Sequence, residues 1–556
     1  MKALRWLWAC SALLGCGQQL VQTAEREPGS DQPQCASPGG LALPQNATFG
    51  TGDEPASALV GAGYGAGEGP GLMIAARDAF RVYLNGELVL SSRTARAAQF
   101  VPLSLLPGDN ALSVVVAAER GTPAALLELD ELERSYVSDD SFRVSTEPAS
   151  GFAGADYDDS DWAPANDFGP AGSLPGCDPG PDLPLAPAAR WIGPAPGTGS
   201  VAVLRKVIRV APLGFGASAN GGGDVSATVI HSWDDLKQAA EEPDQPAVLL
   251  LPEGNYDFRD TPRDQAVCPS TCSNDATKPQ YTVLVGTQAC SVALVTKQRH
   301  ERSLSLGSNK TLVGLGRGAQ IRGVIFDLGS SHNLVLRNLA LYDVNPELVE
   351  AGDAFTLDSP SQVWIDHCTT KWISDGFIDA SAGTKDITLS WLHLDGVNSQ
   401  ECNGEHTRAC QLNDTNATIY DTFFDHVLGH APRADGSLAL VHVFNNLLSD
   451  NQGYGVGSIC GAQVLMEGNT LQRVATPTAR DTCSDKTALG AISAPAGSNY
   501  YGDDVGAHHG GDGKEPHDTV FDPPYRYTLE VPQETWRNVS ARAGAGGPWA
   551  LPLSLD

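Results

Sequence analysis

Val363-Trp-Ile-Asp-His-Cys368, followed by Asp375-Gly-Phe-Ile-Asp379, is the stretch of sequence from which the fold of this chain can be inferred. Its apolar residues two positions apart predict a half-buried strand, because successive side chains of a strand point to opposite faces of a sheet. The polar residues that close the first half predict a bend, and the second half carries two carboxylates. Each half recurs in weaker form along the C-terminal part of the chain, which indicates a repeated structural unit.

The repeat consists of short segments in which apolar residues alternate and a polar pair follows. Their starts lie roughly 23 to 30 residues apart, which predicts one coil per repeat. Parallel strands stacked in this way form a parallel β-helix. A β-propeller or a β-sandwich is the alternative, but neither needs a coil this short with one strong strand per repeat. The segments begin at Leu334, Val363, Ile387, Ala417, Val441 and Val464.

Two further features fit a stack of coils that starts near residue 213. Asn446 and Asn469 occupy the same position of their repeats, where stacked amides can hydrogen-bond from coil to coil. Ser232-Trp-Asp-Asp235 predicts the start of a short helix, with Ser232 as its N-cap. Such a helix would cover the N-terminal end of the stack. We therefore predict a parallel β-helix over residues 213–556.

Residues 46–212 carry the signals of short strands joined by turns. Residues 79–84 predict a strand, Asn85-Gly86 predicts a tight hairpin turn, and residues 111–116 form an apolar run suited to a buried strand. The strand with Asn85-Gly86, the turn that ends in Pro-Gly-Asp-Asn110 and the segment from Tyr157 to Trp162 resemble the galactose-binding-like jelly-roll modules of exported carbohydrate-active proteins. The resemblance implies a β-sandwich. The acid-rich segment allows a sugar site, a calcium turn or a solvated turn, and its lack of EF-hand spacing favours the last.

The composition indicates a turn-rich, mainly β protein of more than one domain. The chain has 556 residues, including 60 Gly and 37 Pro, and a formal net charge of -30. This length exceeds that of one ordinary compact domain. The negative charge argues against nucleic acid as a partner, because phosphate binding needs a basic surface. It leaves an anionic substrate open, because a bound divalent cation can invert the local field.

The N-terminus has the layout of a secretory signal. Two basic residues precede an apolar run from Trp6 to Leu14, which is too short to span a bilayer as a helix. The following Gly15-Cys16 resembles the end of a bacterial lipoprotein signal. This resemblance implies a signal over residues 1–16, with Cys16 as the lipidated first residue of the mature chain. The alternative is an ordinary signal with a cysteine at this place by chance.

The mature protein is accordingly expected to be an exported, monomeric lipoprotein of the outer membrane or cell surface, or a form released from it. The lipid is its only predicted membrane attachment, because no other long apolar run exists. Residues 17–45 are polar and rich in Pro, Gln and Gly, which is typical of a flexible linker. Of the 12 cysteines, Cys10 leaves with the signal and Cys16 carries the lipid. The others favour structural disulfides, because their number is even and no zinc-finger spacing is present.

Four stretches of the C-terminal part together resemble one known family. They are Gly307–Gly316, Asn333–Leu339, the segment from Gly352 to Asp379, and Val441–Asn446. In this order they resemble a pectate lyase of the large extracellular β-helix family that also includes the pectin lyases. The resemblance covers about residues 213–500 and implies an all-β fold with a right-handed parallel β-helix. It implies as substrate an acidic polysaccharide such as pectate.

The chemistry of such a reaction needs a cation and a base. Eliminative cleavage removes a weakly acidic proton next to a carboxylate, so a cation must absorb the charge that develops there. Calcium suits this task, because it accepts several carboxylate oxygens in a flexible shell. The resemblance implies that Asp353, Asp375 and Asp379 hold Ca²⁺. The alternative is that these acids are bend residues facing water.

Asp366 and His367 belong to the most recognisable motif of the family. They lie at the end of the predicted strand, where the resemblance implies a structural role. We interpret both residues as orienting the bend and not as catalytic.

The chain also departs from the family pattern. Ala351 stands where a further calcium-binding acid is common, with Glu350 as a neighbour that can substitute. The substrate-binding lysine of the family falls among Gly396-Val-Asn-Ser399, where no basic residue occurs. In His430-Ala-Pro-Arg-Ala-Asp435, His430 and Asp435 stand where the family has arginines, and Arg433 is the remaining cation.

Two hypotheses follow from these departures. In the first, His430 is the general base of an active lyase, since an imidazole titrates near neutrality, and Arg433 binds the uronate carboxylate together with calcium. In the second, the chain has lost the reaction and binds acidic glycans at the cell surface. A hydrolase on the same fold is a weaker choice, because the paired-Asp and Gly-His-Gly motifs of polygalacturonases are absent. An unrelated β-helix adhesin is weaker still.

Overall fold

The computed structural model describes residues 59–60, 67–93, 98–173, 185–272, 277–284, 289–398, 400, 408–484, 488–510 and 512–553. The predicted signal, the lipidation site Cys16 and the linker lie outside these residues. Among the described residues, no helix combines the length and the apolar character that a membrane crossing requires.

Two antiparallel sheets between residues 71 and 210 share one apolar core and form a β-sandwich. Leu72, Ile74, Val82, Val114 and Leu204, which come from both sheets, are fully buried in this core. One sheet has the order β10-β11-β6-β1-β4, with β7 beside β6, and contains β1 (Gly71–Ala76), β4 (Gln99–Pro102), β6 (Ala125–Asp130), β7 (Ser135–Val137), β10 (Asn166–Pro170) and β11 (Arg190–Gly193). The other has the order β3-β2-β5-β12-β8-β9 and contains β2 (Ala79–Leu84), β3 (Glu87–Ser92), β5 (Gly108–Ala117), β8 (Arg143–Ser145), β9 (Ala163–Pro164) and β12 (Val201–Val210). The 3-10 helix η1 spans Ala171–Ser173.

The local predictions for this sandwich are confirmed. Asn85 and Gly86 have φ angles of 51° and 89°, as a tight turn between β2 and β3 requires. In the acid-rich segment, Asp159 pairs with the buried Arg205, and the rings of Tyr157 and Trp162 pack edge to face at 5.6 Å. The segment is therefore anchored to the sandwich by an ion pair and an aromatic contact.

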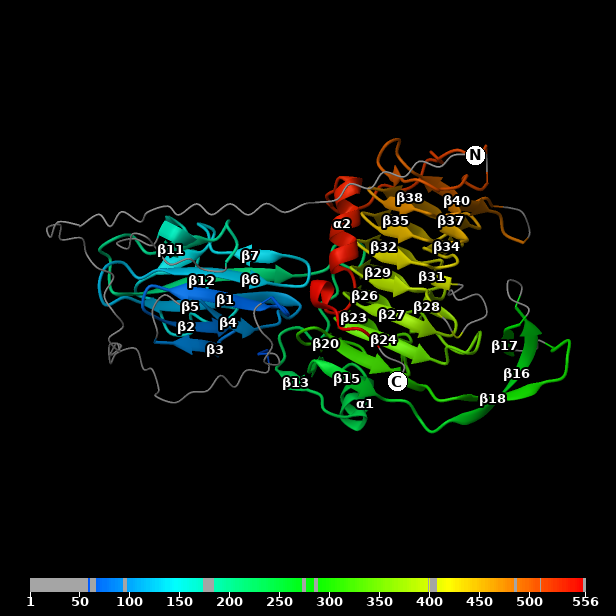
Figure 1. Ribbon diagram of the computed structural model, residues 1–556, viewed down its shortest axis with the longest axis horizontal. Helices are drawn as coiled ribbons and strands as arrows, with labels where there is room; N and C mark the ends of the chain where they lie inside the picture. Colours follow the sequence, from blue (N-terminus) through cyan, green and yellow to red (C-terminus); the bar gives the residue numbers. More distant parts are fainter. Residues whose placement is uncertain are drawn as a thin grey trace, which may run out of the picture. The chain divides into compact units, whose positions relative to one another are not determined.

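Three parallel sheets form the β-helix, in which each central coil contributes one strand to each sheet (Figure 1). Within the described residues these sheets have ten, nine and eight strands. The ten-stranded sheet contains β13 (Ala227–Val229), β14 (Ala247–Leu251), β20 (Lys310–Gly314), β23 (His332–Arg337), β26 (Ser361–Asp366), β29 (Lys385–Ser390), β32 (Asn416–Tyr420), β35 (Leu440–Phe444), β38 (Gln463–Glu467) and β41 (Ala491–Ser493).

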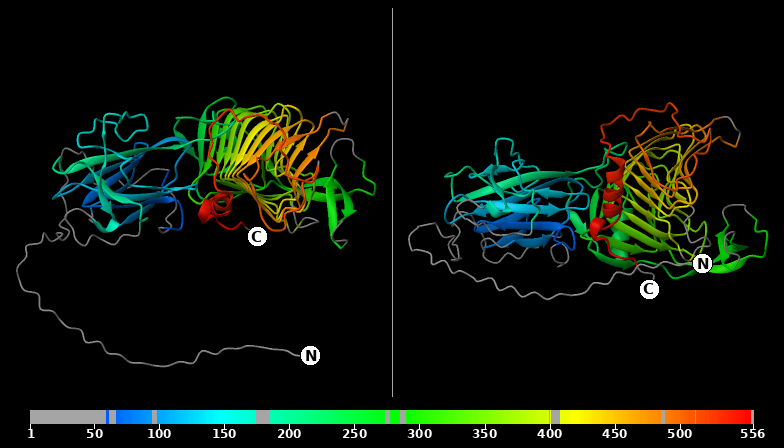
Figure 2. Two further views of the ribbon diagram at one scale, coloured as in Figure 1. Left: turned by 90° about the horizontal axis from the view of Figure 1, so that it is seen from above. Right: turned by 45° about the horizontal axis from the view of Figure 1, so that its top comes forward.

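The other two parallel sheets follow the same coils, which Figure 2 shows from two further directions. The nine-stranded sheet contains β15 (Gly254–Asp257), β21 (Ala319–Arg322), β24 (Leu339–Val344), β27 (Thr369–Ile373), β30 (His393–Asp395), β33 (Phe423–Asp425), β36 (Leu447–Ser449), β39 (Thr470–Gln472) and β42 (Tyr500–Tyr501). The eight-stranded sheet contains β19 (Arg302–Ser305), β22 (Val324–Asp327), β25 (Phe355–Leu357), β28 (Gly376–Ala380), β31 (Arg408–Asn413), β34 (Arg433–Asp435), β37 (Tyr454–Ile459) and β40 (Thr476–Asp481).

The predicted repeat is confirmed residue by residue. Each predicted segment start is the direct partner of the next in the ten-stranded sheet, and all of them are fully buried; they are Leu334, Val363, Ile387, Ala417, Val441 and Val464. The alternating apolar residues of every coil therefore point into one continuous core.

The remaining elements are an inserted sheet and the helices. The insert is antiparallel, has the order β17-β16-β18 and contains β16 (Arg263–Thr271), β17 (Pro279–Val283) and β18 (Val295–Arg299). The helices are α1 (Trp233–Glu241), α2 (Pro532–Arg542) and the 3-10 helix η2 (Gly547–Trp549). The N-cap prediction for α1 is confirmed, because the Ser232 hydroxyl accepts a hydrogen bond from the Asp235 N–H at 3.2 Å. Leu236 and Ala240 of α1 lie in the core of the β-helix.

Disulfides are present as predicted, but not at every cysteine. Cys268 is bonded to Cys290, and Cys460 is bonded to Cys483. Cys368 and Cys410 are free and buried, because both point into the apolar core of the stacked coils.

The predicted amide ladder is present and extends by one residue. The Asn446 amide donates to the Asn469 side-chain oxygen at 3.0 Å, and the Asn469 amide donates to the Asn499 side-chain oxygen at 2.9 Å. All three residues are buried. The ladder satisfies polar groups of three successive bends inside the stack, as buried amides require.

We expect Asn469→Ala to lower the free energy of unfolding by about 3 kcal/mol, because it leaves the buried N–H groups of Asn446 without their acceptor. The measurement is urea unfolding followed by circular dichroism, with the midpoint compared at unchanged slope. Asn255→Ala, at an exposed position of β15, is the control and should change stability by less than about 0.5 kcal/mol. Equal shifts in the two variants would rule out a stabilising ladder.

Candidate active site

The three predicted calcium ligands lie around one cavity on the eight-stranded sheet. Asp353 precedes β25, Asp375 precedes β28, and Asp379 lies within β28, which pairs directly with β25. The cavity has a volume of about 360 Å³ and is also lined by His430 and Arg433. Its remaining lining residues are Gly376, Ile378, Arg408, Gln411 and Asn413. The structure therefore gathers the predicted acids, the predicted base and the predicted cation in one place.

Strand register explains how residues so far apart in sequence meet. Asp379 is the direct partner of Gln411 in β31, and Gln411 is the direct partner of Arg433 in β34. Neighbouring strands lie about 4.8 Å apart, so these side chains form a polar column on the outside of three successive coils. A bound polymer could contact acids at one end of this column and a guanidinium at the other.

Arg408 is a component of the site that the sequence motifs do not reveal. Its Nη1 lies 3.0 Å from Asp375 Oδ1, and its Nη2 lies 2.9 Å from Glu350 Oε1. It opens β31 as the partner of Gly376. The only signal in the sequence is its place at the start of an alternating segment, Arg408–Asn413. The position expected for a lysine includes Ser399, which lies outside the described residues.

The carboxylates of the cavity carry more negative charge than the nearby guanidinium offsets. Burial and the charges of Asp375 and Asp379 raise the pKa of Asp353 well above its usual value. Burial and the charge of Glu350 raise the pKa of Asp375 to about 7, although Arg408 acts in the opposite direction. Burial, with a contribution from Glu350, also raises the pKa of Asp379 against the effect of Arg408. A group of partly buried acids with raised pKa values is typical of a functional site.

This donor set fits a hard divalent cation. Within the described residues the Asp379 carboxylate accepts no hydrogen bond, so its oxygens are available to an ion. Asp353 Oδ1 accepts only from the Gly376 N–H among these residues, at 2.6 Å. Oxygen-rich sites of this kind suit calcium, and a bound cation would remove the repulsion that raises the pKa values.

The departure from an acid at Ala351 has a packing reason. Ala351 is fully buried in a small apolar cluster with Val267, Val283 and Leu348, where a carboxylate would be desolvated. Its neighbour Glu350 instead pairs with Arg408, which lines the cavity. The substitution of Glu350 for the missing acid stays a prediction, and its ion pair with Arg408 places it one contact away from the cavity.

The loop that carries Glu350 and Asp353 is fixed by a buried polar network. The Ala351 carbonyl accepts hydrogen bonds from Arg299 Nη2 at 3.0 Å and from Asn345 Nδ2 at 3.1 Å. The Glu301 carboxylate holds both donors in place, since it pairs with Arg299 and accepts from Asn345 at 2.8 Å. The insert adds a further anchor, because the Val283 N–H donates to the Val349 carbonyl at 2.9 Å.

His430 and Arg433 approach the cavity from the bend before β34 and from β34 itself. The His430 ring lies 5.7 Å from the ring of Tyr454, and its carbonyl accepts from the Cys410 N–H at 2.7 Å. Arg433 Nη2 lies 2.5 Å from Asp435 Oδ2. Burial raises the pKa of Tyr454 to about 12, so this hydroxyl is neutral beside Arg433. Asp435, in the place of a family arginine, thus holds the remaining cation at the edge of the site.

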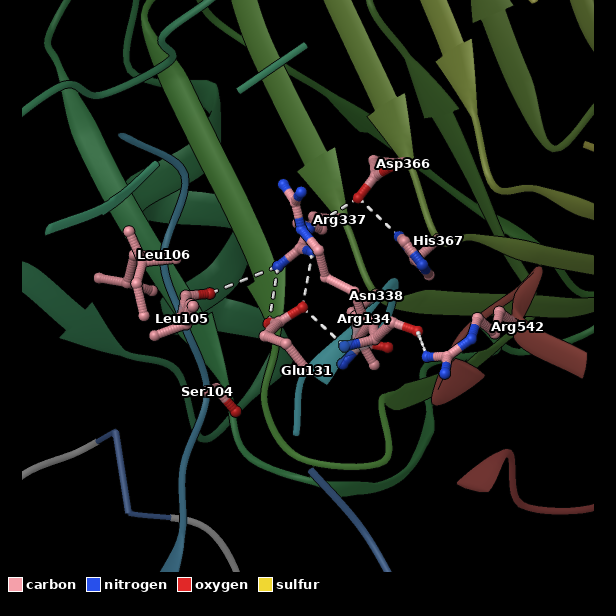
Figure 3. Close-up of polar contacts among 12 residues, drawn as sticks. Ser104, Leu105, Leu106, Glu131, Arg134, Arg337, Asn338, Asp366, His367 and Arg542 are labelled. Atoms are coloured by element: carbon pink, nitrogen blue, oxygen red, sulfur yellow. Dashed lines mark hydrogen bonds and ion pairs between the residues drawn. The ribbon is translucent and has the colours of Figure 1, made fainter. Parts of the chain in front are cut away.

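Asp366 and His367 lie in a different environment and do not line the cavity. Asp366 Oδ2 accepts from Arg337 Nε at 2.7 Å and is 2.8 Å from His367 Nδ1 (Figure 3). Arg337 also contacts the Glu131 carboxylate of the sandwich at 3.1 Å. The His367 ring stacks on Trp391 at 5.5 Å. These contacts agree with a structural role for Asp366 and His367 at the bend.

Two basic neighbours compensate the charge of the buried Asp366. Burial alone would raise its pKa, but His367 and Arg337 lower it to about 2. Burial would lower the pKa of Arg337, but Glu131 and Asp366 raise it. Each charge of this network therefore depends on its partners.

We expect Asp366→Asn to destabilise the protein by about 3 kcal/mol at neutral pH, because it leaves Arg337 buried with one counter-ion fewer. The folded-state pKa lies below the ordinary value, so this carboxylate contributes stability above about pH 4 and loses it as the pH falls toward 2. Unfolding midpoints of the two proteins should therefore converge between these pH values. A constant difference down to pH 2 would contradict this account.

Comparison with known proteins agrees with the fold. Residues 274–496 match the family model described as pectate lyase. Probable pectin lyase F-2 of Aspergillus terreus is 27% identical over 293 residues, which cover 50% of this chain and 60% of the relative. Pectin lyase D of Aspergillus niger is 29% identical over 285 residues, which cover 49% of this chain and 75% of the relative. The chain thus spans about 60% of the first relative's length.

Two pectate lyases are among the solved structures to which this chain is similar. Pectate lyase II from Xanthomonas campestris is 19% identical, with a TM-score of 0.41, and covers 61% of this chain and 100% of its own. Pectate lyase C from Erwinia chrysanthemi, at pH 9.5 with 30 mM Ca²⁺, is 15% identical, with a TM-score of 0.40, and covers 62% of this chain and 99% of its own.

The C-terminal part of the chain has the fold of a right-handed parallel β-helix. This β-helix is similar to the pectate lyase family, whose model matches residues 274–496, and to the pectin lyases, as the sequence motifs predict.

Proposed function

We propose that this protein cleaves a uronic-acid polysaccharide of the pectate or polygalacturonate type by calcium-assisted β-elimination. The observation that carries the proposal is the common cavity of three predicted calcium ligands, one histidine and two arginines. The names of the relatives, pectin lyases and pectate lyases, support the substrate class. The disulfides support export, since such bonds persist in oxidising compartments.

In this proposal Asp353, Asp375 and Asp379 hold Ca²⁺, with Glu350 as a neighbouring acid. The bound ion supplies positive charge that makes the proton next to the uronate carboxylate more acidic. Arg408 limits the repulsion among the acids by pairing with Asp375 and Glu350. Arg433, on the next coil of the same column, binds a substrate carboxylate, and its contact with Asp435 sets its direction.

His430 is the proposed general base. An arginine keeps its proton in proteins, whereas a neutral imidazole can accept one near pH 7. His430 takes the proton from the carbon that bears the carboxylate, and the electron pair forms a double bond to the neighbouring carbon. The bond from that carbon to the glycosidic oxygen breaks, and the leaving oxygen takes a proton from water. The product has an unsaturated sugar at its new non-reducing end.

The second hypothesis, an acidic-glycan-binding protein without activity, has support in one contact. Arg433 is already paired with Asp435, and the second family arginine is missing. The lipid at Cys16, attachment through it alone, the monomeric state, the jelly-roll module with its sugar-binding role, and the domain limits at residues 45 and 212 are parts of the proposal that rest on the sequence.

We expect the purified protein to release unsaturated product from polygalacturonate, measured by ultraviolet absorbance, with calcium and not with a chelator. Methylated pectin and other uronates are tested as alternative substrates in the same assay.

Asp379→Asn should weaken calcium binding at least tenfold in titration calorimetry, because a carboxylate ligand is lost. Asp358→Asn, at an exposed acid after β25, is the control. Equal activity in chelator would exclude the calcium part of the proposal.

We expect His430→Ala to lower kcat by roughly 100-fold or more, because a positioned general base contributes at least that much. Gel retardation with polygalacturonate should be unchanged. His332→Ala, which removes an exposed histidine, is the matched control. Unchanged turnover in His430→Ala would exclude this residue as the base. Retained binding without unsaturated product from any uronate, already in the unsubstituted protein, would favour the binding hypothesis.

A further inference from the structure

A second group of metal-ligating side chains lies on the nine-stranded sheet and shares no residue with the cavity of the candidate active site. His393 and Asp395 come from β30, and Asp425 ends β33 on the next coil. One ligand atom of each residue lies within 4.8 Å of those of the other two. His393 Nε2 is 3.1 Å from Asp425 Oδ2. One imidazole and two carboxylates thus converge on one point.

Packing fixes the orientation of these groups. Asp395 and Asp425 are direct partners in the sheet, so their side chains point the same way. His393 is the direct partner of Phe423, and the two rings stack at 4.9 Å with an angle of 5° between their planes. The stack presents the edge of the imidazole to Asp425. On the other side, His426 Nδ1 contacts Asp425 Oδ1 at 2.6 Å.

A cation already occupies one side of the group. Lys371, on the preceding coil, is the direct partner of Asp395 and forms an ion pair with it. A neighbouring ammonium is what two adjacent carboxylates need when no metal is bound. It also means that an incoming metal ion competes with Lys371 for Asp395.

The group is open to solvent on one side. His393 and Asp395 line a cavity of about 450 Å³, together with Lys371 and Trp372. A metal ion could enter through this cavity and keep a water molecule there, as ions with three protein ligands do.

We propose that His393, Asp395 and Asp425 form a binding site for a divalent transition-metal ion of the Zn²⁺ type. The imidazole nitrogen sets its preference, since zinc accepts nitrogen and carboxylate ligands, whereas calcium prefers oxygen alone. The ion joins two successive coils through their side chains. This inference is independent of the proposed lyase activity.

A neighbouring triad, Asp425, His426 and Asp450, is the competing location. It is less suited to a metal, because Arg473 Nη2 lies 2.6 Å from Asp450 Oδ2, and Ser449 also donates to that carboxylate. His426 is more exposed than His393, at 40% against 28% of its side chain. The two triads can be separated, because each has its own histidine.

The experiment is titration calorimetry of the chelator-treated full chain with zinc alone, and with cobalt followed by visible absorption. We expect one zinc ion per chain, bound at least tenfold more weakly by His393→Gln. Glutamine can still donate to Asp425, so the fold is preserved. His332→Ala and Asp379→Asn should bind zinc as the unsubstituted protein does. The second variant separates this site from the proposed calcium site.

Lys371→Met gives the sharper test. We expect this substitution to strengthen zinc binding several-fold, because it removes the ammonium that competes for Asp395. If the Lys371–Asp395 ion pair is purely structural, neither protein binds zinc at this place. Zinc affinity that is equal in His393→Gln and the unsubstituted protein would overturn the proposal. Loss of zinc in His426→Ala with retention in His393→Gln would overturn it as well. Thermal unfolding with and without zinc provides a second readout, because a ligand of the folded state raises Tm.

Discussion

In-register parallel pairing is the constraint on which both the fold and the site depend. A slip of one residue would turn every side chain of a strand to the opposite face. In β28 such a slip would move Asp379 into the core and expose Ile378. In the native register, Ile378 separates the site from the apolar interior. The buried start residue of each coil and the asparagine ladder both oppose a slip. The polar column of Asp379, Gln411 and Arg433 is therefore a product of the packing inside the coils.

The surroundings of the carboxylates shift their pKa values in two opposite directions. Asp366 is surrounded by Arg337, His367 and Ser390, and its pKa falls to about 2. Asp375 has a single guanidinium that it shares with Glu350, and its pKa rises to about 7. The first arrangement stabilises a bend and joins it to Glu131 of the sandwich. The second keeps a surplus of negative charge that a cation or a cationic partner can use.

Most of the fold could be predicted from the sequence, because each coil repeats the same alternation of apolar residues. The site could be predicted only where a motif marks it, as for Asp353, Asp375 and His430. Arg408 could not be predicted from the sequence, because a long connection separates β30 from β31. The register that places Arg408 beside Gly376 therefore cannot be derived from the repeat. The packing reason for Ala351 was also out of reach, because its neighbours Val267 and Val283 belong to an insert that lies outside the repeat.

Two free cysteines among the described residues allow the local opening of this β-helix to be measured chemically. Cys368 and Cys410 lie in the core on coils of the same stack, and burial raises the pKa of Cys368 to about 12 and that of Cys410 as well. Thiol reagents attack the thiolate, so both sulfurs are inert while the coils are closed. The rate at which each one becomes alkylated thus reports how often its own coil separates from its neighbours. Because both thiols belong to the natural sequence, the separation of each coil from its neighbours can be measured without an added label.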